Sequence, residues 1–235
     1  MSKELLRKLV LKAWTITVSA YAEECRRWLY IKKVARPPAD YKLLKNILNE
    51  AYGFYGIFWH EADLALYFSY NLLKVFFDSN IRLHIHTNYK LKPQNFRRDQ
   101  TMYKKLKEAV KELRRATGKR VQYPEVDIII SDPLASYFEM CIELKYYHYS
   151  PKGLGLNPLK NIRTKCLILR KLIKAGVCRD AAILILDDYL ERNLPDIHKR
   201  IVKELKRCSK YGILTSIHSI TFDDLVKTYL KKAGI

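Results

Sequence analysis

The sequence has few of the residues that build covalent or metal-linked scaffolds. Its five cysteines are widely spaced, and no two of them form a Cys-x-x-Cys pair. An odd number of isolated cysteines argues against both a disulfide framework and a zinc knuckle. We therefore expect reduced, mostly buried thiols in a cytoplasmic protein.

Targeting and membrane-spanning segments are also missing. The N-terminus has no apolar core followed by a small-residue cleavage site, which argues against a secretory signal. The stretch 51–77 is apolar, but His60, Glu61 and Asp63 lie near its middle, where a lipid-spanning helix would carry a large penalty. We expect a soluble protein with no membrane partner. The absence of a Walker A pattern gives no sign of an ATP-driven motor.

Acidic residues are scarce relative to basic ones. The 24 Asp and Glu face 44 Lys and Arg, which leaves a net charge of +20. Such an excess repels itself when the chain folds, and nucleic acid is the polyanion that most readily offsets the repulsion. The alternative is a lysine-rich surface that only keeps a heat-tolerant protein soluble. The chain has only three glutamines beside many Lys, Ile and Tyr, which indicates a thermophilic source.

Hydrophobic spacing predicts an α/β protein with a mixed sheet flanked by helices. Expected helices cover 3–35, 41–77, 97–117, 159–175 and 192–208, and expected strands cover 81–87, 126–131, 138–147, 181–186 and 213–220. Thr221 and Asp224 resemble a capping box for a last helix. We expect an N-terminal helical extension over 1–50, which we predict to form a homodimer, followed by one α/β domain over 51–235.

Charged residues inside two apolar strands mark a candidate active site. Glu143 and Lys145 share one face of their strand, because side chains alternate along a strand. With a turn centred on Ala135, residues whose numbers sum to 270 face each other, so Asp127 lies opposite Glu143. Facing carboxylates repel unless a cation lies between them, and Mg²⁺ prefers oxygen ligands. Lys145 is then placed to orient water and to neutralise charge on a phosphate.

A second interpretation is a cross-strand salt bridge on an exposed sheet face, because Glu-x-Lys is a common tripeptide. The flanking residues favour the first interpretation. Positions 128–130 and 140–142 are apolar, which predicts strands covered on both sides. Charges in such strands are more often functional.

The segment Pro124-Glu125-Val126-Asp127, followed after fifteen residues by Glu143-Leu144-Lys145, resembles the PD-(D/E)xK nuclease superfamily. The resemblance covers roughly residues 57–220 and implies a restriction-endonuclease-like core. The proline stands three residues before the aspartate instead of beside it, and a long basic insertion separates the first two strands.

The resemblance also implies roles for individual residues. Asp127, Glu143 and the Leu144 carbonyl are the implied ligands of Mg²⁺, for which Mn²⁺ substitutes, and Lys145 is the implied catalytic lysine. A further acid comes from the preceding helix, where Glu61 is preferred to Asp63 and Glu50 on its placement in the family pattern.

Basic residues near this segment are the expected nucleic-acid contacts. They are Lys160, Arg163 and Lys165 in the helix after the hairpin, and Arg97, Arg98 and Lys104 in the inserted basic region. His84 and His86 lack a third metal ligand at a suitable spacing and are predicted to be ordinary histidines. Tyr146 and Tyr147 are predicted to pack in the interior instead of stacking on bases.

The predicted function is a Mg²⁺-dependent endonuclease that hydrolyses double-stranded or branched DNA, with RNA left open as the substrate. One alternative is a nucleic-acid-binding protein with a catalytically inactive nuclease fold. Another is a protein-interaction module in which the charge serves solubility alone.

Overall fold

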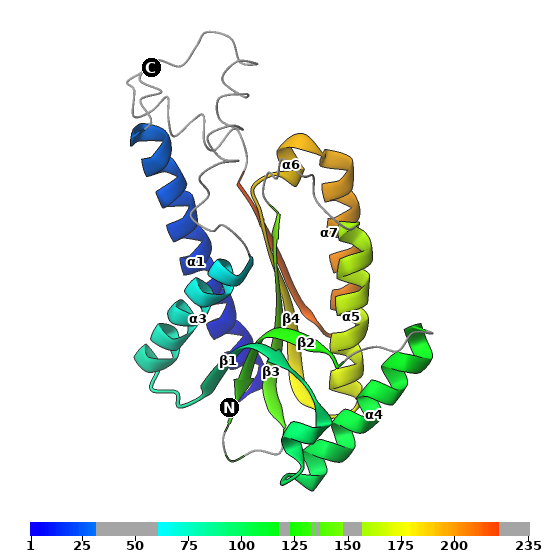
Figure 1. The fold of residues 1–235 in the computed structure, drawn as a ribbon. Coiled ribbons are helices and arrows are strands. Elements are labelled where there is room, and N and C mark those ends of the chain that lie inside the picture. Colours follow the sequence, from blue (N-terminus) through cyan, green and yellow to red (C-terminus); the bar gives the residue numbers. More distant parts are fainter. Residues whose placement is uncertain (32–60, 118–122, 133, 135–136, 148–156, 221–235) are drawn as a thin grey trace.

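A computed structural model describes residues 1–31, 61–117, 123–132, 134, 137–147 and 157–220. Its centre is a five-stranded mixed sheet in the order β1-β2-β3-β4-β5 (Figure 1). Strands β1 (His84–Lys90), β2 (Glu125–Ser131) and β3 (Phe138–Tyr147) form an antiparallel meander. Strands β4 (Cys178–Asp187) and β5 (Leu214–Ser219) continue parallel to β3. The expected α/β class with a mixed sheet is therefore confirmed.

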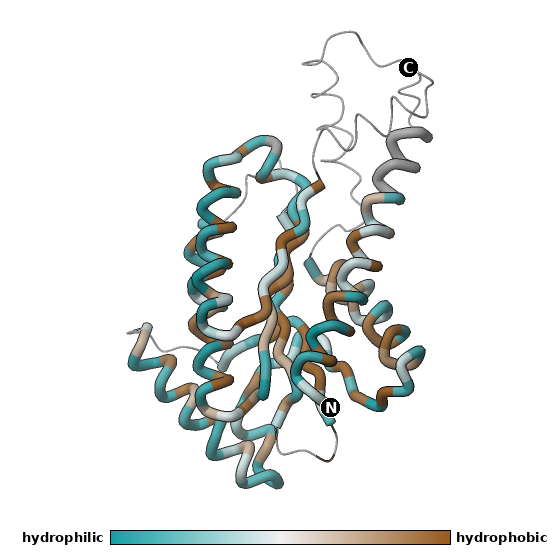
Figure 2. Tube along the Cα trace, turned by 180° about the vertical axis from the view of Figure 1, so that it is seen from behind, coloured by the Kyte–Doolittle hydropathy of each residue, from teal (hydrophilic) through white to brown (hydrophobic). Residues whose placement is uncertain are grey.

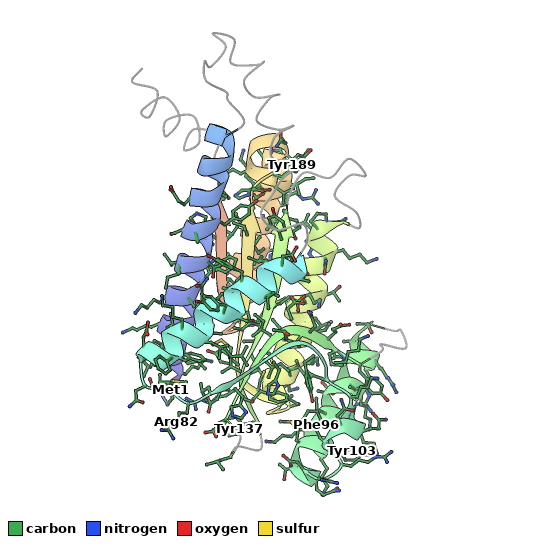
Figure 3. The ribbon with its side chains drawn as sticks, turned by 60° about the vertical axis from the view of Figure 1, so that its left-hand side comes forward. Met1, Arg82, Phe96, Tyr103, Tyr137 and Tyr189 are labelled. Atoms are coloured by element: carbon green, nitrogen blue, oxygen red, sulfur yellow. The ribbon has the colours of Figure 1, made fainter. Side chains whose placement is uncertain are left out.

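One face of the sheet is covered by α1 (Lys3–Ile31) and α3 (Glu61–Asp78), which cross each other (Figures 1 and 3). Their buried residues share one core with Ile128, Ile142 and Leu184 of the sheet. Arg7 of α1 also makes a double hydrogen bond to the buried Asp180 of β4, at 2.6 and 2.8 Å.

These contacts make α1 part of the main core. The described part of the expected extension over 1–50 therefore packs onto the sheet of its own chain, and its buried face is occupied there. Residues 32–50 lie outside the described part.

The other face is covered by α4 (Gln100–Thr117), α5 (Pro158–Lys174) and α7 (Pro195–Lys210), on the side away from α1 and α3 (Figure 2). The short helices η1 (Pro93–Phe96) and α6 (Leu190–Asn193) lead into α4 and α7. Asn157 caps α5 by accepting hydrogen bonds from the amides of Leu159 and Lys160, and Pro158 takes the first helical position, where no amide donor is needed.

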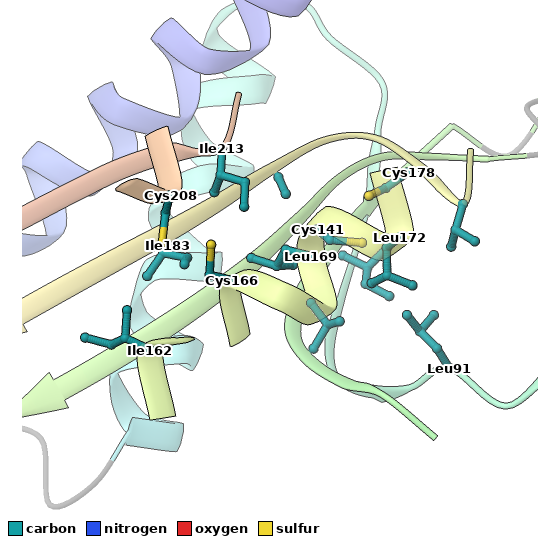
Figure 4. Packing of buried hydrophobic residues seen from close by; sticks show 14 of the residues in the cluster. Leu91, Cys141, Ile162, Cys166, Leu169, Leu172, Cys178, Ile183, Cys208 and Ile213 are labelled. Carbon is teal, nitrogen blue, oxygen red and sulfur yellow. The ribbon is translucent and has the colours of Figure 1, made fainter. Parts of the chain in front are cut away.

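Figure 4 shows part of this second core, where four of the cysteines gather. Cys141, Cys166, Cys178 and Cys208 are buried and free, as expected. Among the described residues, no helix is long and apolar enough to cross a membrane.

The predicted hairpin register is confirmed. Ile128 faces Ile142, Ile129 faces Cys141 and Ile130 faces Met140, so each pair sums to 270. A bulge between Ile130 and Ser131 shifts the pairing only next to the turn. The strand predicted at 138–147 has those bounds.

Two predicted elements differ from the structure by more than a shift of one end: the first strand and the helix at 192–208. The first strand begins at His84 and ends at Lys90, not at 81–87, because the chain is still leaving α3 at 79–81. There Asn80 takes a positive φ of 54° and the Ile81 amide donates to the Phe76 carbonyl, which closes the helix end. The helix predicted at 192–208 is two helices, because the chain breaks at Leu194, before Pro195.

Other predictions fall outside the description. The part of the predicted helix 41–77 before Glu61 lies there, as does the capping box at Thr221 and Asp224.

Candidate active site

The strands β2 and β3 separate at the predicted site. Their backbone pairing ends at Ile128 and Ile142. One residue further, Oδ2 of Asp127 accepts a hydrogen bond of 2.7 Å from the backbone amide of Leu144. The Asp127 carboxylate thus accepts the hydrogen bond of the Leu144 amide at a point where β2 offers no backbone carbonyl to it.

The ammonium group of Lys145 lies at this fork, among four oxygen atoms. Its Nζ is 2.8 Å from Oε1 of Glu61, 3.0 Å from Oε1 of Glu143 and 3.8 Å from Oδ2 of Asp127. It also donates to the Leu144 carbonyl at 2.5 Å. The structure therefore brings together all four residues that were expected to ligate a metal, around the side chain expected to be the catalytic lysine.

Three elements build this cluster: β2 carries Asp127, β3 carries Glu143 and Lys145, and α3 carries Glu61. Glu143 and Lys145 point to the sheet face covered by α4, α5 and α7, since Ile142 and Leu144 belong to the core on the other face. Glu61 comes from the first turn of α3, in the opposite helix layer, and still reaches Lys145.

The cluster has a buried floor and an open side. The side chains of Glu143 and Lys145 are 1% and 6% exposed, whereas those of Asp127 and Glu61 are 15% and 40% exposed. Solvent or a ligand can therefore approach from the side of Asp127 and Glu61.

A second lysine enters the cluster from α5. Nζ of Lys165 lies 2.6 Å from Oε1 of Glu143, and it also donates to the Glu125 carbonyl at 3.2 Å. Lys165 was predicted to contact phosphate, but its side chain instead forms an ion pair with Glu143 in the carboxylate site. Glu143 is thus held between two ammonium groups.

Burial raises the pKa of Glu143 to about 7, and the neighbouring Asp127 charge adds to this rise. Lys145 and Lys165 act in the opposite direction, but they do not cancel it. Burial also lowers the pKa of Lys145, yet the three carboxylates outweigh burial and raise it overall. Lys145 is therefore a protonated ammonium at neutral pH, beside an acid that can exchange its proton.

Tyr147 continues the row of polar residues on this face of β3. Its hydroxyl is buried and, within the described residues, has no hydrogen-bond partner. Burial raises the pKa of this phenol. Its ring packs in the second core, as predicted, and the ring of Tyr146 packs in the first.

Asp187 lies beside Tyr147 on the neighbouring strand and was not predicted from the sequence. Its carboxylate accepts hydrogen bonds from the backbone amides of residues 189, 190 and 191 at the start of α6. Its Oδ2 also lies 2.7 Å from Nδ1 of His198. The only signal in the sequence was an aspartate that ends an apolar strand. In Figure 3, the labelled Tyr189 marks this end of the sheet, opposite to Phe96 and Tyr103.

The other predicted nucleic-acid contacts lie on the helix surfaces. Arg163 is exposed and pairs with Glu204 of α7 at 3.0 Å. Lys160, Arg97, Arg98 and Lys104 are exposed on α5, on the segment before α4 and on α4.

Basic charge is divided unequally between the two helix layers. The helices α4, α5 and α7 together carry 18 basic and four acidic residues. Residues 3–23 of α1 together with α3 carry five of each sign. The basic layer is the one that faces Glu143 and Lys145.

The histidines and acids that the sequence did not assign to the metal site lie elsewhere or have other partners. Nε2 of His86 lies 3.0 Å from the Ser131 hydroxyl, and His84 is exposed. Glu139 pairs with Arg179 at 3.1 Å. Glu61, and not Asp63, is the helical acid that contacts Lys145. Glu50 lies outside the described residues.

The donor set suits a hard cation, because it consists of three carboxylates and a backbone carbonyl. Among the described residues, no three His, Cys, Asp or Glu side chains are grouped closely enough to hold an ion, since Lys145 lies between the carboxylates. Binding of a metal would require Lys145 to yield this central position.

Comparisons with models of protein families, with curated proteins and with solved structures find no match to this chain.

Proposed function

We propose that this chain is a metal-dependent endonuclease with a restriction-endonuclease-like core, which hydrolyses phosphodiester bonds of double-stranded or branched DNA. The observation that carries the proposal is the convergence of Glu61, Asp127, Glu143 and the Leu144 carbonyl on one cationic nitrogen. Buried charges are costly, and such clusters occur most often where chemistry needs them.

The order of elements supports the assignment to the PD-(D/E)xK superfamily. A helix leads to an antiparallel β1-β2-β3 meander, and α5 then crosses over to β4, which runs parallel to β3. This is the strand, strand, helix order that the resemblance implies.

Asp127, Glu143, the Leu144 carbonyl and Glu61 are the residues that would hold Mg²⁺, with Mn²⁺ as a substitute. When bound, the ion supplies a Lewis acid and lowers the pKa of a coordinated water. Lys145 holds its proton at Nζ and stabilises negative charge on the phosphate. Lys165 lowers the pKa of Glu143 and so favours its ionised form, against the effect of burial.

The uneven charge supports a nucleic-acid substrate. Phosphates neutralised by Lys and Arg release counterions, and this release favours binding most where basic residues are dense. The layer of α4, α5 and α7 has a surplus of 14 positive charges on the site's side of the sheet.

A second candidate function is a nucleic-acid-binding protein without catalysis. The observation in its favour is that Lys145 already lies between the three carboxylates in an ion-pair network, with Lys165 as a second cation on Glu143. Both candidates require the basic layer, so cleavage separates them and binding does not.

The test is cleavage of supercoiled plasmid and of branched DNA with Mg²⁺, with Mn²⁺ and with a chelator. We expect metal-dependent cleavage by the wild type and its loss in Asp127→Ala and Lys145→Ala. Lys12→Ala is the matched control, because it removes an exposed positive charge on α1, outside the basic layer, and should leave cleavage nearly intact. If both substrates stay intact with either metal while binding persists, the second function replaces the first.

A further inference from the structure

Helix α3 has two apolar faces, and only one of them is buried in the chain. Residues such as Leu64, Phe68 and Leu72 are fully buried against α1 and the sheet. A second set points outward: Leu66 is 71% exposed, Tyr70 63%, Leu73 50% and Phe77 85%. We call these last four residues the outer stripe.

The outer stripe forms a continuous line. Its members are spaced by four, three and four residues, so at about 100° per residue they fall within roughly 60° of the helix circumference. Single exposed apolar side chains are ordinary, but a line about 17 Å long on one helix is typical of an interaction surface.

The charge around the outer stripe indicates what can bind there. Helix α3 carries three acidic residues and one lysine, in a chain with a net charge of +20. It therefore does not favour nucleic acid. It belongs to the nearly neutral helix layer, where a second copy of this strongly basic chain meets the least repulsion.

The spacing of the outer stripe is self-complementary. Leu66 with Phe77, and Tyr70 with Leu73, each give the same sum of residue numbers, 143. If α3 packs antiparallel on a second α3, Leu66 meets the partner subunit's Phe77, and Tyr70 meets the partner subunit's Leu73. A two-fold interface requires a patch that is complementary to itself, whereas an unrelated partner does not.

We propose that the chain forms a homodimer in which α3 packs antiparallel against α3 of the partner subunit, through the outer stripe. This interface differs from the one predicted from the sequence over 1–50. The described part of that region uses its apolar face within its own chain, whereas the outer stripe is exposed.

The first measurement is the molar mass of the full chain by sedimentation equilibrium, without DNA or metal. We expect a dimer for the wild type. We expect a monomer for Tyr70→Lys and for Leu73→Glu, because each places two unpaired charges in the apolar centre. Circular dichroism checks that both variants keep their helix content.

Mixing the two variants tests the register. The introduced lysine of one chain then faces the introduced glutamate of the other, while Leu73 of the first chain faces Tyr70 of the second. We expect the equimolar mixture to recover the dimer mass that each variant alone has lost. No other pairing register restores both contacts at once.

Glu61→Gln is the matched control, since it lies on the same helix but outside the outer stripe, and it should remain dimeric. A wild type that sediments as a monomer overturns the proposal. A monomer is also the result expected if other residues of the same chain cover the outer stripe, so that case counts against the proposal as well. A dimer that survives both charge substitutions also overturns it. Neither outcome depends on whether the protein cleaves DNA.

Discussion

The carboxylate of Asp127 accepts the Leu144 amide at 2.7 Å, at the point where the backbone pairing of β2 and β3 ends. This one contact fixes the aspartate in position and leaves its second oxygen available at a partly exposed fork. It also orients the peptide whose carbonyl contacts Lys145. The same residue thus has a structural and a proposed catalytic role, which substitution can separate.

We expect Asp127→Asn to fold normally and to cleave DNA about 100-fold less well or worse, since an amide oxygen still accepts the Leu144 amide but carries no charge for a metal. Asp127→Ala should lose activity and also about 1–3 kcal/mol of stability, because the amide loses its partner. Thermal unfolding and metal-dependent cleavage, measured on both variants, check this. Full activity in Asp127→Asn would remove it from the proposed metal site.

The raised pKa of Glu143 predicts a dependence of stability on pH. Its pKa rises from 4.5 to about 7 on folding, so the folded state binds more protons between these values. The stability of the metal-free protein should therefore fall as the pH rises from about 4.5 through about 7, by about 3 kcal/mol from this group. Urea unfolding at pH 5 and pH 8 measures the change.

Glu143→Gln is the control for this prediction, because glutamine does not titrate. The difference between wild type and variant should vary across this pH window and be constant above it. A constant difference at every pH would show that Glu143 titrates at its ordinary value in the folded protein.

Lys165 offers a test of the electrostatics of the site. Removing its charge in Lys165→Met should raise the pKa of Glu143 further, because Lys165 lowers that pKa in the wild type. Cleavage near pH 7 should fall by about 10- to 100-fold, and part of it should return at higher pH as Glu143 ionises. The pH–rate profile is the measurement.

Arg163→Met is the matched comparison, since Arg163 lies half a helical turn earlier on α5 and pairs with Glu204 at the surface. Its pH–rate profile should keep the shape of the wild-type profile, because Arg163 does not contact Glu143. If both variants shift the profile equally, the effect belongs to general surface charge and not to the site.

The division of charge between helix layers predicts where DNA binds. The double variant Lys104→Glu/Lys111→Glu on α4 should bind DNA more weakly and with a shallower salt dependence, by about 0.9 in log–log slope for each lost phosphate contact. Lys8→Glu/Lys12→Glu on α1 makes the same change of net charge in the nearly neutral layer. It should bind almost as the wild type does, as measured by fluorescence anisotropy over a range of salt concentrations.

Equal weakening by the two pairs would mean that DNA responds to net charge alone. A larger effect of the α1 pair would place the DNA on the opposite layer and contradict the proposed orientation.

The sequence alone determined the hairpin and its register. Alternation along a strand and the position of the turn are local properties, so the pairing of residues that sum to 270 followed from the chain order. This was enough to predict Asp127 near Glu143 and Lys145, although the observed backbone pairing ends one pair earlier, at Ile128 and Ile142. The strand 138–147 and the mixed sheet also followed from apolar runs bounded by turn residues.

Only the tertiary structure decided which helical side chains enter the site. Lys165 points at Glu143 while Arg163 points to solvent. Residues two apart on a helix lie about 200° apart around its axis, so turning α5 about that axis would put Arg163 at the site instead of Lys165. The contact of Glu61 and the division of charge between the layers likewise depend on how helices pack across the sheet. Packing joins residues far apart in the chain, and no local pattern encodes those distances.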